Sequence, residues 1–241
     1  MRQGCEARRC GGGRGGAVET SLPLSGFWIS SRKGQWDVRY NLRMTKQPLK
    51  NICVYCGSSD DVDARYYAAA RRLGAALAAR GYTLVYGGGS TGLMGAVADA
   101  ALEAGGEAIG VIPEVFYTPQ LAHTALTRLE IVPDMHARKA RMIALADAFI
   151  AMPGGYGTWE EVFEALTWAQ IGLHTKPIGF YNVHGYYTPL LQFIRHAREE
   201  GFLFAEHEAL FVHADDPVTL LTALAAYRHP GGVARWMRED T

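Results

Sequence analysis

The sequence has no excess of charge, no long apolar run and few cysteines. Lysine plus arginine and aspartate plus glutamate number 24 each among 241 residues, so the formal net charge is zero. A neutral chain has no overall field that would attract nucleic acid or an anionic membrane. The sequence also lacks the roughly 18 consecutive apolar residues of a membrane-spanning helix, and its first residues do not read as a secretory signal. We therefore expect a cytoplasmic protein with neither a nucleic-acid nor a membrane partner.

The four cysteines, at positions 5, 10, 53 and 56, are a poor disulfide framework for a chain of this length. Cys53 and Cys56 form a C-x-x-C pair, but they fall in a predicted strand, where residues three apart point to opposite faces. This geometry favours ordinary strand residues over a redox pair or half of a zinc site. His123 and His136 are isolated, and we expect neither a metal nor another cofactor.

The chain is predicted to divide into three parts. Residues 1–47 are rich in glycine and arginine and show no sustained hydrophobic periodicity, so we expect a disordered or loosely attached extension. Residues 48–230 form the predicted folded domain, and residues 231–241 form a C-terminal tail. Met44 lies just before the folded part and is a candidate for the biological start. The alternative is an Arg/Gly arm that contacts nucleic acid.

From Leu49 onward, predicted strands and helices alternate. Alternation of this kind indicates an α/β fold of the Rossmann-like class, a doubly wound parallel sheet flanked by helices. In such sheets the ligand lies beyond the carboxyl ends of the strands, where the strand order reverses. The predicted strands cover 50–56, 83–86, 107–112, 128–132, 148–152, 177–181 and 210–213, and the predicted helices cover 63–80, 92–104, 134–146, 158–171, 187–200 and 216–227.

The most informative run is Pro153–Glu161, with the sequence P-G-G-Y-G-T-W-E-E. It follows an apolar predicted strand, 148–152, and leads into a predicted helix, so it is a strand-to-helix turn. Glycines in such a turn allow close backbone approach, and the free N–H groups of a new helix face an incoming anion. The run therefore predicts a phosphate cradle directly beside a pair of carboxylates.

Two further glycine-bearing loops follow earlier predicted strands. Gly57 and Ser58 come after the first strand, and the run Gly87–Gly92, G-G-G-S-T-G, comes after the second. Neither loop continues into the Lys-Ser/Thr pair of a Walker motif or has the spacing of G-x-G-x-x-G, so ATP hydrolysis and dinucleotide binding lose support. Each loop alone is as consistent with a structural turn. Three such loops at the ends of successive strands favour an anion site.

A basic segment, Asp134–Met142, lies between the fourth and fifth predicted strands. A helix that starts near Asp134 places Met135 and Arg138 on one side. Paired basic residues on a helix are usually solvated surface. Beside three anion-binding loops, however, Arg138 and Lys139 are better interpreted as phosphate or ribose contacts.

These segments together resemble the LOG (LONELY GUY) family, the cytokinin riboside 5′-monophosphate phosphoribohydrolases. The resemblance spans about residues 50–230 and includes the full signature P-G-G-x-G-T-x-x-E, which ends at Glu161. It implies hydrolysis of the N-glycosidic bond of adenine-type nucleoside 5′-monophosphates, cytokinin riboside monophosphates and AMP among them, to the free base and ribose 5-phosphate. Members of the family are often labelled lysine decarboxylases. This chain is short for such an enzyme and shows no distinct lysine site for pyridoxal phosphate.

The resemblance also implies roles for individual residues. Glu161 and Arg138 take the catalytic positions, with the carboxylate beside C1′ and the guanidinium in an orienting and charge-stabilising role. Gln120 stands where family members commonly carry a substrate-contacting glutamate. Glu160 is expected to contact substrate or to be structural, and Glu164 is a third carboxylate near the site. The expected substrate-binding residues are Gly57, Ser58, Gly88, Gly89, Ser90, Thr91, Gln120, Met135, Lys139, Gly154, Gly155, Tyr156, Gly157, Thr158, Glu160 and Thr167.

The helix that carries Val162, Phe163, Leu166, Trp168 and Ile171 has more apolar surface than one sheet face requires, and family members are commonly dimers, so we expect a homodimer.

The alternative function is a non-catalytic nucleotide or molybdenum-cofactor carrier that uses the same cradle. A carrier needs the glycines but has no need of a carboxylate beside C1′.

Overall fold

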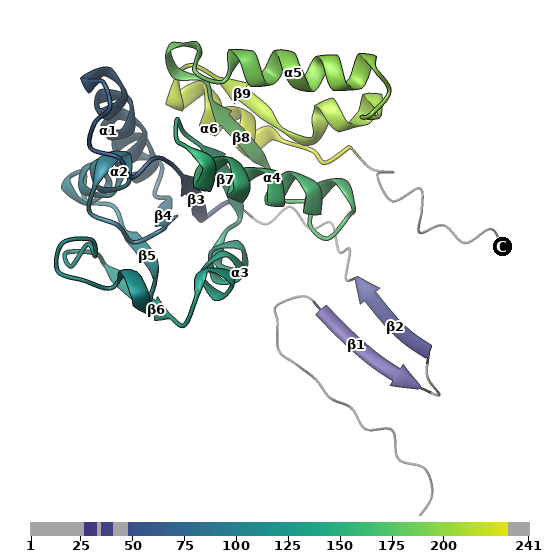
Figure 1. Ribbon diagram of the computed structural model, residues 1–241, viewed down its shortest axis with the longest axis horizontal. Coiled ribbons are helices and arrows are strands. Elements are labelled where there is room, and N and C mark those ends of the chain that lie inside the picture. Colours follow the sequence, from purple (N-terminus) through teal and green to yellow (C-terminus); the bar gives the residue numbers. More distant parts are fainter. Residues whose placement is uncertain (1–26, 33–34, 41–47, 231–241) are drawn as a thin grey trace, which may run out of the picture. The chain divides into compact units, whose positions relative to one another are not determined.

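The fold is built on a seven-stranded, all-parallel sheet (Figure 1). The computed structural model describes residues 27–32, 35–40 and 48–230, and it divides into two units, 1–46 and 47–241. The strands of the sheet are β3 (Asn51–Tyr55), β4 (Thr83–Tyr86), β5 (Ala108–Pro113), β6 (Arg128–Val132), β7 (Ala148–Ala151), β8 (Ile178–Tyr181) and β9 (Val212–Ala214).

The strand order is β6-β5-β4-β3-β7-β8-β9. The first strand of this sheet along the chain, β3, lies in its middle. The next strands, β4, β5 and β6, follow outward on one side, and the chain then returns to place β7 on the other side of β3. There Ile52 pairs with Ala148 and Tyr55 with Ala151. The order therefore reverses between β3 and β7, which is the point where doubly wound sheets bind their ligands. The predicted fold class is confirmed.

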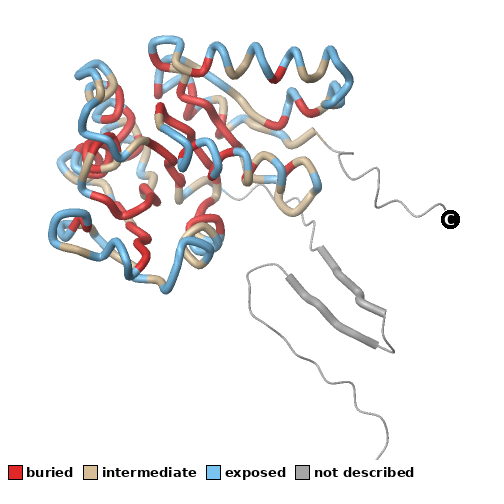
Figure 2. Tube along the Cα trace, in the orientation of Figure 1, coloured by how far each residue is buried: buried red, intermediate tan, exposed pale blue. Residues whose placement is uncertain are grey.

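Six helices of the larger unit cover the two faces of this sheet. They are α1 (Ala64–Ala79), α2 (Gly92–Glu103), α3 (Met135–Leu145), α4 (Tyr156–Gln170), α5 (Thr188–Glu199) and α6 (Pro217–Ala226). Helices α1, α2 and α6 pack on one face, and α3, α4 and α5 pack on the other. Because both faces are covered, the central strands are continuous apolar runs, and the buried part of the trace follows them (Figure 2).

The two cysteines of the C-x-x-C pair confirm the predicted geometry. Cys53 is buried in the core on the α3 and α4 side, and Cys56 is buried in the core on the α1 and α2 side. Both are free thiols. They contribute to two different halves of the core, as expected of ordinary strand residues.

Some boundaries differ from the prediction. Helix α4 begins at Tyr156, two residues earlier than expected, because Gly155 is its N-cap. The last strand is Val212–Ala214, displaced from the predicted 210–213 because a short 3₁₀ helix, Ala205–Leu210, occupies the residues before it. No helix among those of the described ranges is long and apolar enough to cross a membrane.

The smaller unit contains two antiparallel strands, β1 (Phe27–Arg32) and β2 (Gln35–Tyr40), in which Phe27 pairs with Tyr40. No regular structure was predicted for this part of the extension. The sequence signal was present, because Trp36, Val38 and Tyr40 alternate with polar residues at the period of a strand. The remaining predictions for residues 1–47, the candidate start at Met44 among them, and those for the tail 231–241 lie outside the described residues.

Candidate functional site

The loops after β3 and β7 meet at the point where the strand order reverses. The Gly57 N–H donates to the Pro153 carbonyl at 3.0 Å. A Cβ on Gly154 would lie 2.8 Å from the Gly57 nitrogen and 2.1 Å from Thr158 Oγ1. Only glycine fits between these neighbours, since real Cβ atoms do not approach so closely. The first glycine of the signature run is thus explained by the close packing of two backbones.

A cavity of about 600 Å³ opens at this junction. Its volume falls in the range of small-molecule sites. The expected residues Gly57, Ser58, Met135 and Arg138 line it, as does the whole run Pro153–Glu161. The other residues in the lining were not among the expected site residues, namely Cys56, Ser59, Val62, Tyr66, Leu93, Met94 and Tyr186.

The N-terminus of α4 forms one wall of the cavity. The N-cap, Gly155, provides no side-chain hydrogen bond, and the first turn contains no acidic residue. In a helix the first N–H groups have no partner within the helix, and the dipole makes this end positive. Residues 155–158 therefore present backbone donors to a space that can hold an anion.

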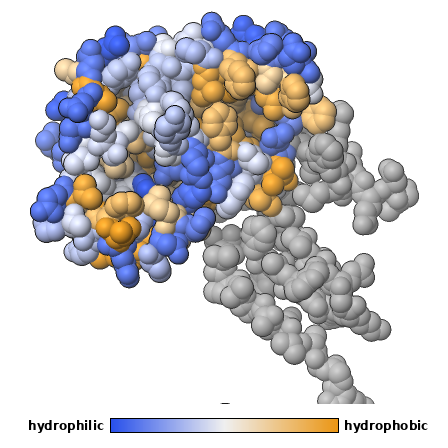
Figure 3. Space-filling view, in the orientation of Figure 1, coloured by the Kyte–Doolittle hydropathy of each residue, from blue (hydrophilic) through white to orange (hydrophobic). Residues whose placement is uncertain are grey.

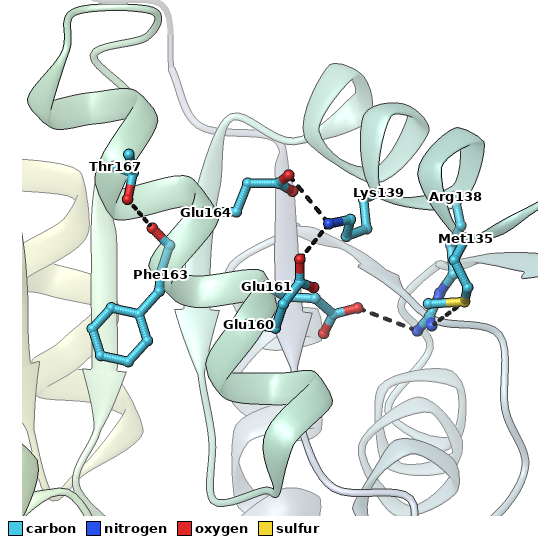
Figure 4. Close-up of polar contacts among 8 residues, drawn as sticks. All are labelled: Met135, Arg138, Lys139, Glu160, Glu161, Phe163, Glu164 and Thr167. Carbon is cyan, nitrogen blue, oxygen red and sulfur yellow. Dashed lines mark hydrogen bonds and ion pairs between the residues drawn. The ribbon is translucent and has the colours of Figure 1, made fainter.

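Arg138 of α3 and Glu161 of α4 face each other in the same cavity (Figure 4). Arg138 Nη2 lies 3.5 Å from Glu161 Oε1, and only 14% and 9% of the two side chains are exposed. Met135 Sδ lies 3.6 Å from Arg138 Nη1. A Cβ on Gly87 would lie 1.9 Å from Arg138 Nη2. The guanidinium is thus held against the backbone at the end of β4, and a side chain at position 87 would displace it.

Burial raises the pKa of Glu161 from 4.5 to about 7, because the charged form loses its hydration. Arg138 opposes this shift, and Glu160 adds to it. A carboxyl whose pKa lies near neutrality can exchange a proton during a reaction at physiological pH. This property and its place in a cavity distinguish Glu161 as a candidate catalytic group.

Lys139 has a different environment from its neighbour Arg138. Its ammonium lies 3.2 Å from Glu164 and also forms a close ion pair with Glu160, so it ties α3 to α4 (Figure 4). Burial lowers the pKa of Lys139, but the hydrogen bonds to Glu160 and Glu164 outweigh burial and raise it. The cavity lining does not include Lys139. Its expected contact with substrate stays a prediction.

The loop after β4 lies outside the cavity lining. The Ser90 N–H donates to the Leu121 carbonyl at 2.8 Å, and Thr91 Oγ1 donates to the Ser58 carbonyl at 2.9 Å. Gly88 accepts from the His123 N–H at 2.9 Å, and Gly89 forms an isolated bridge with Ala122. The loop therefore holds its neighbours in place, and the substrate contacts expected of residues 88–91 stay predictions.

Two further expected residues also lie away from the cavity. The Gln120 carbonyl accepts from Ser90 Oγ at 3.3 Å, within the segment that follows β5. Thr167 lies on an exposed face of α4, where its hydroxyl donates to the Phe163 carbonyl at 2.7 Å (Figure 4). The second bond is the usual way in which a helical threonine satisfies its own hydroxyl.

The residues that sequence reasoning missed come from segments far apart in the chain. Val62 lies just before α1, Tyr66 lies in its first turn, and Tyr186 follows β8. The one available signal was topological, because each segment follows a strand that borders or lies next to the reversal point.

The side chains of this site decide which metals or cofactors it can hold. Among the described residues, no group of three or more His, Cys, Asp and Glu side chains could hold a metal ion. Pyridoxal phosphate requires a lysine amine for its Schiff base. No lysine is among the described residues that line the cavity, and the Lys139 ammonium is engaged by two glutamates. These residues do not fit that cofactor.

Residues 94–224 match a protein-family model described as "Possible lysine decarboxylase". The chain is 48% identical over 178 residues to a probable cytokinin riboside 5′-monophosphate phosphoribohydrolase of Oryza sativa subsp. japonica, which covers 74% of this chain and 84% of that protein. It is 46% identical over 184 residues to a cytokinin riboside 5′-monophosphate phosphoribohydrolase of Arabidopsis thaliana, covering 76% of this chain and 86% of the relative.

Solved structures share the fold. The molybdenum cofactor carrier protein of Chlamydomonas reinhardtii superposes with a TM-score of 0.57 at 25% identity, over 74% of this chain and 99% of the carrier. The molybdenum cofactor binding protein of Rippkaea orientalis superposes with a TM-score of 0.56 at 20% identity, over 74% and 96%, which is evidence for the fold alone. Relatives that are far more similar in sequence are the phosphoribohydrolases. The chain therefore belongs to the LOG family, the cytokinin riboside 5′-monophosphate phosphoribohydrolases.

Proposed function

We propose that this protein hydrolyses the N-glycosidic bond of adenine-type nucleoside 5′-monophosphates to the free base and ribose 5-phosphate. The observation that carries the proposal is the Arg138–Glu161 pair, which lines the same cavity as the uncapped N-terminus of α4. An anion site beside a buried carboxyl suits a phosphorylated sugar. The names of relatives with 46–48% identity point to the same reaction.

The chemistry assigns separate tasks to the two catalytic residues. As the bond between C1′ and the base nitrogen breaks, its electron pair leaves with the base, and the sugar develops positive charge. The Glu161 carboxylate stabilises that charge and accepts a proton from the water whose oxygen bonds to C1′. The departing base takes up one proton from solvent, and Glu161 returns to solvent the proton it accepted from water, so the reaction balances as hydrolysis. Arg138, which stays protonated, orients the carboxylate and the substrate.

The 5′-phosphate is proposed to bind at the N-terminus of α4, over residues 155–158. Backbone N–H groups that bind a phosphate form charge-assisted hydrogen bonds, each worth about 1.5–3 kcal/mol. A few such bonds are enough to separate a nucleotide from a nucleoside. We therefore expect strong selectivity for the monophosphate, and equal turnover of AMP and adenosine would contradict it.

The direct test is to incubate the full chain with AMP and with isopentenyladenosine monophosphate, and to separate free bases by chromatography. We expect base and ribose 5-phosphate in equal amounts from the wild type and a large loss of both with Glu161→Gln. Tight nucleotide binding without release of base would instead favour the carrier function. That rival has the fold of the molybdenum-cofactor carriers in its favour but gives no role to a carboxyl held opposite an arginine.

We also propose that the active protein is a cytoplasmic homodimer that pairs through α4. Part of the apolar surface expected to pair the subunits belongs to the core, since Val162 is fully buried. An exposed stripe remains, formed by Tyr156, Trp159, Phe163 and Ile171, and Figure 3 shows apolar surface in the region of α4. Light scattering after gel filtration tests the pairing, because Phe163→Glu should convert the dimer to monomer. Cell fractionation tests the location.

A further inference from the structure

The β7–α4 loop has three consecutive carbonyl groups, and each accepts a hydrogen bond from a different partner. The Tyr187 hydroxyl donates to the Met152 carbonyl at 2.5 Å, and the Gly57 N–H donates to the Pro153 carbonyl at 3.0 Å. The Tyr186 hydroxyl donates to the Gly154 carbonyl at 2.6 Å. The loop is therefore fixed from the β3 side by a backbone group and from the β8 side by two tyrosines.

This anchoring matters for the sign of the potential in the cavity. Each peptide unit has a positive N–H end and a negative carbonyl end, so a loop that binds an anion must point its carbonyls elsewhere. Gly154 has no side chain to restrict the rotation of its peptide, and its carbonyl is the last before the uncapped start of α4 at Gly155. The Tyr186 hydroxyl is the partner that fixes the direction of this carbonyl.

The turn after β8 sets the position of both tyrosines. His184 and Gly185 have positive φ angles of 54° and 72°, which fold the chain tightly between β8 and α5. Asn182 Oδ1 accepts from the Tyr187 N–H at 2.7 Å. The Tyr186 ring contacts the rings of Tyr66 and Tyr187 edge to face, with centroids 6.0 Å and 5.0 Å apart. The hydroxyl of Tyr186 is thus held by packing as well as by its own bond.

We propose that Tyr186 is a positioning residue for the phosphate of the substrate: its hydroxyl holds the Gly154 carbonyl out of the anion site, so that the loop presents only N–H groups there. The inference rests on the proposed function for the identity of the anion. Tyr186 also lines the cavity, but its single hydroxyl proton is committed to Gly154, so it has no proton to donate to a phosphate. Its effect is exerted through the loop.

The test replaces Tyr186 by phenylalanine, which keeps the ring contacts and removes only the hydroxyl. The Kd of AMP is measured calorimetrically with Glu161→Gln and with Glu161→Gln/Tyr186→Phe, and kcat and KM are measured for Tyr186→Phe alone. We expect the Kd and KM for AMP to rise about 5- to 10-fold, the loss of one hydrogen bond, while kcat changes less than about twofold. The KM for adenosine, which lacks the phosphate, should not change.

Tyr187→Phe is the matched control, since its hydroxyl bonds to Met152, one step further from the anion site. It should lower the melting temperature without raising the Kd of AMP. Four results would overturn the inference. They are an equal rise in the Kd of AMP with both tyrosine variants, no rise with Tyr186→Phe, a rise in the KM for adenosine, and failure of Glu161→Gln to bind AMP. If the wild type releases no base while Tyr186→Phe still weakens AMP binding, the proposed reaction fails and the role of Tyr186 stands.

Discussion

Two glycine-rich turns of this protein look alike in sequence and differ in the folded state. The turn after β4, Gly87–Thr91, and the turn after β7, Pro153–Gly157, both connect a buried strand to a helix. At the second turn no side chain caps the helix, and its first N–H groups face the cavity. At the first turn the Gly92 N–H of α2 donates to an Asp60 carboxylate oxygen at 2.8 Å, and the Leu93 N–H donates to the Gly57 carbonyl at 3.0 Å.

A glycine-rich turn can bind an anion only where its backbone donors are left free, and the two turns differ in this respect. Asp60 already supplies a negative charge at the N-terminus of α2, where the dipole favours it. A phosphate at that position would compete with a tethered carboxylate. The turn after β4 instead supports the loop after β3, through the bond from the Thr91 hydroxyl to the Ser58 carbonyl, and its Gly87 lies against the guanidinium of Arg138.

The largest effect is expected at the carboxyl beside the open turn. Glu161→Gln should lower kcat for AMP by about 10²–10³-fold, because the amide cannot stabilise positive charge or accept a proton from water. Base release measured by chromatography gives kcat, and calorimetry should give a Kd for AMP close to that of the wild type. Glu160→Gln is the comparison: that side chain is half exposed and pairs with Lys139, so we expect a loss below about tenfold. Equal losses in the two variants would remove the distinction between them.

The comparison of the turns themselves predicts unequal losses of phosphate affinity. Gly154→Ala places a Cβ against Thr158 and Gly57 and should raise the KM for AMP by about 100-fold, through displacement of the cradle. Ser90→Ala removes hydroxyl bonds to two carbonyls of the neighbouring segment and should raise it less than about threefold. Steady-state kinetics with AMP measures both. A large effect of Ser90→Ala would assign part of the phosphate site to the turn after β4.

The pH dependence of the reaction should report the carboxyl of the open turn. In the proposed mechanism the ionised form of Glu161 acts, and its pKa in the free protein is about 7, so kcat/KM should fall as the pH drops below 7, by about tenfold per unit well below the pKa. Rates of base release from AMP between pH 5 and 9 measure this. A profile that stays flat down to pH 5 would show that no group with a raised pKa controls the reaction.

The smallest effect is on stability. Burial raises the pKa of Glu161 from 4.5 to about 7, so between these values the folded state holds a proton that the unfolded chain has lost. Stability from this group is present below pH 4.5 and is lost as the pH rises to 7. Glu161→Gln has no charge to bury and should be more stable than the wild type at pH 8 by about 1–3 kcal/mol, and nearly equal to it at pH 5. Urea unfolding at the two pH values tests the sign.

Much of the fold followed from local sequence patterns. Apolar runs such as 148–152 are typical of strands with both faces covered, and their alternation with amphipathic helices predicted a parallel doubly wound sheet. The strands at 27–32 and 35–40 were missed because the surrounding glycine-rich composition was given more weight than a short alternating pattern. The boundary of α4 was displaced because Gly155, and not a polar side chain, begins the helix.

The site was predicted in part for the same physical reason. Glu161 and Arg138 were identified because their residue types and the signature run carry the chemistry, and the structure places them 3.5 Å apart. Tyr66 and Tyr186 were missed because nothing in their own segments marks a site. The substrate contacts expected of Gly88, Ser90 and Thr91 stay predictions, since the partners of backbone donors are not visible in a sequence.

The sequence by itself determined the class of fold and the position of the glycine-rich turn with the carboxyl that follows it, because periodicity and glycine spacing act over a few residues. Only the tertiary structure decided which of the two similar turns keeps its backbone donors free. After β4, Asp60 accepts from the first N–H group of α2, whereas after β7 no side chain caps α4 and the Tyr186 hydroxyl bonds to the Gly154 carbonyl. It also decided the chemistry of Glu161, whose raised pKa depends on burial among elements that are distant in the chain. Hydrogen-bond partners and desolvation are properties of the assembled neighbours, and no local pattern specifies them.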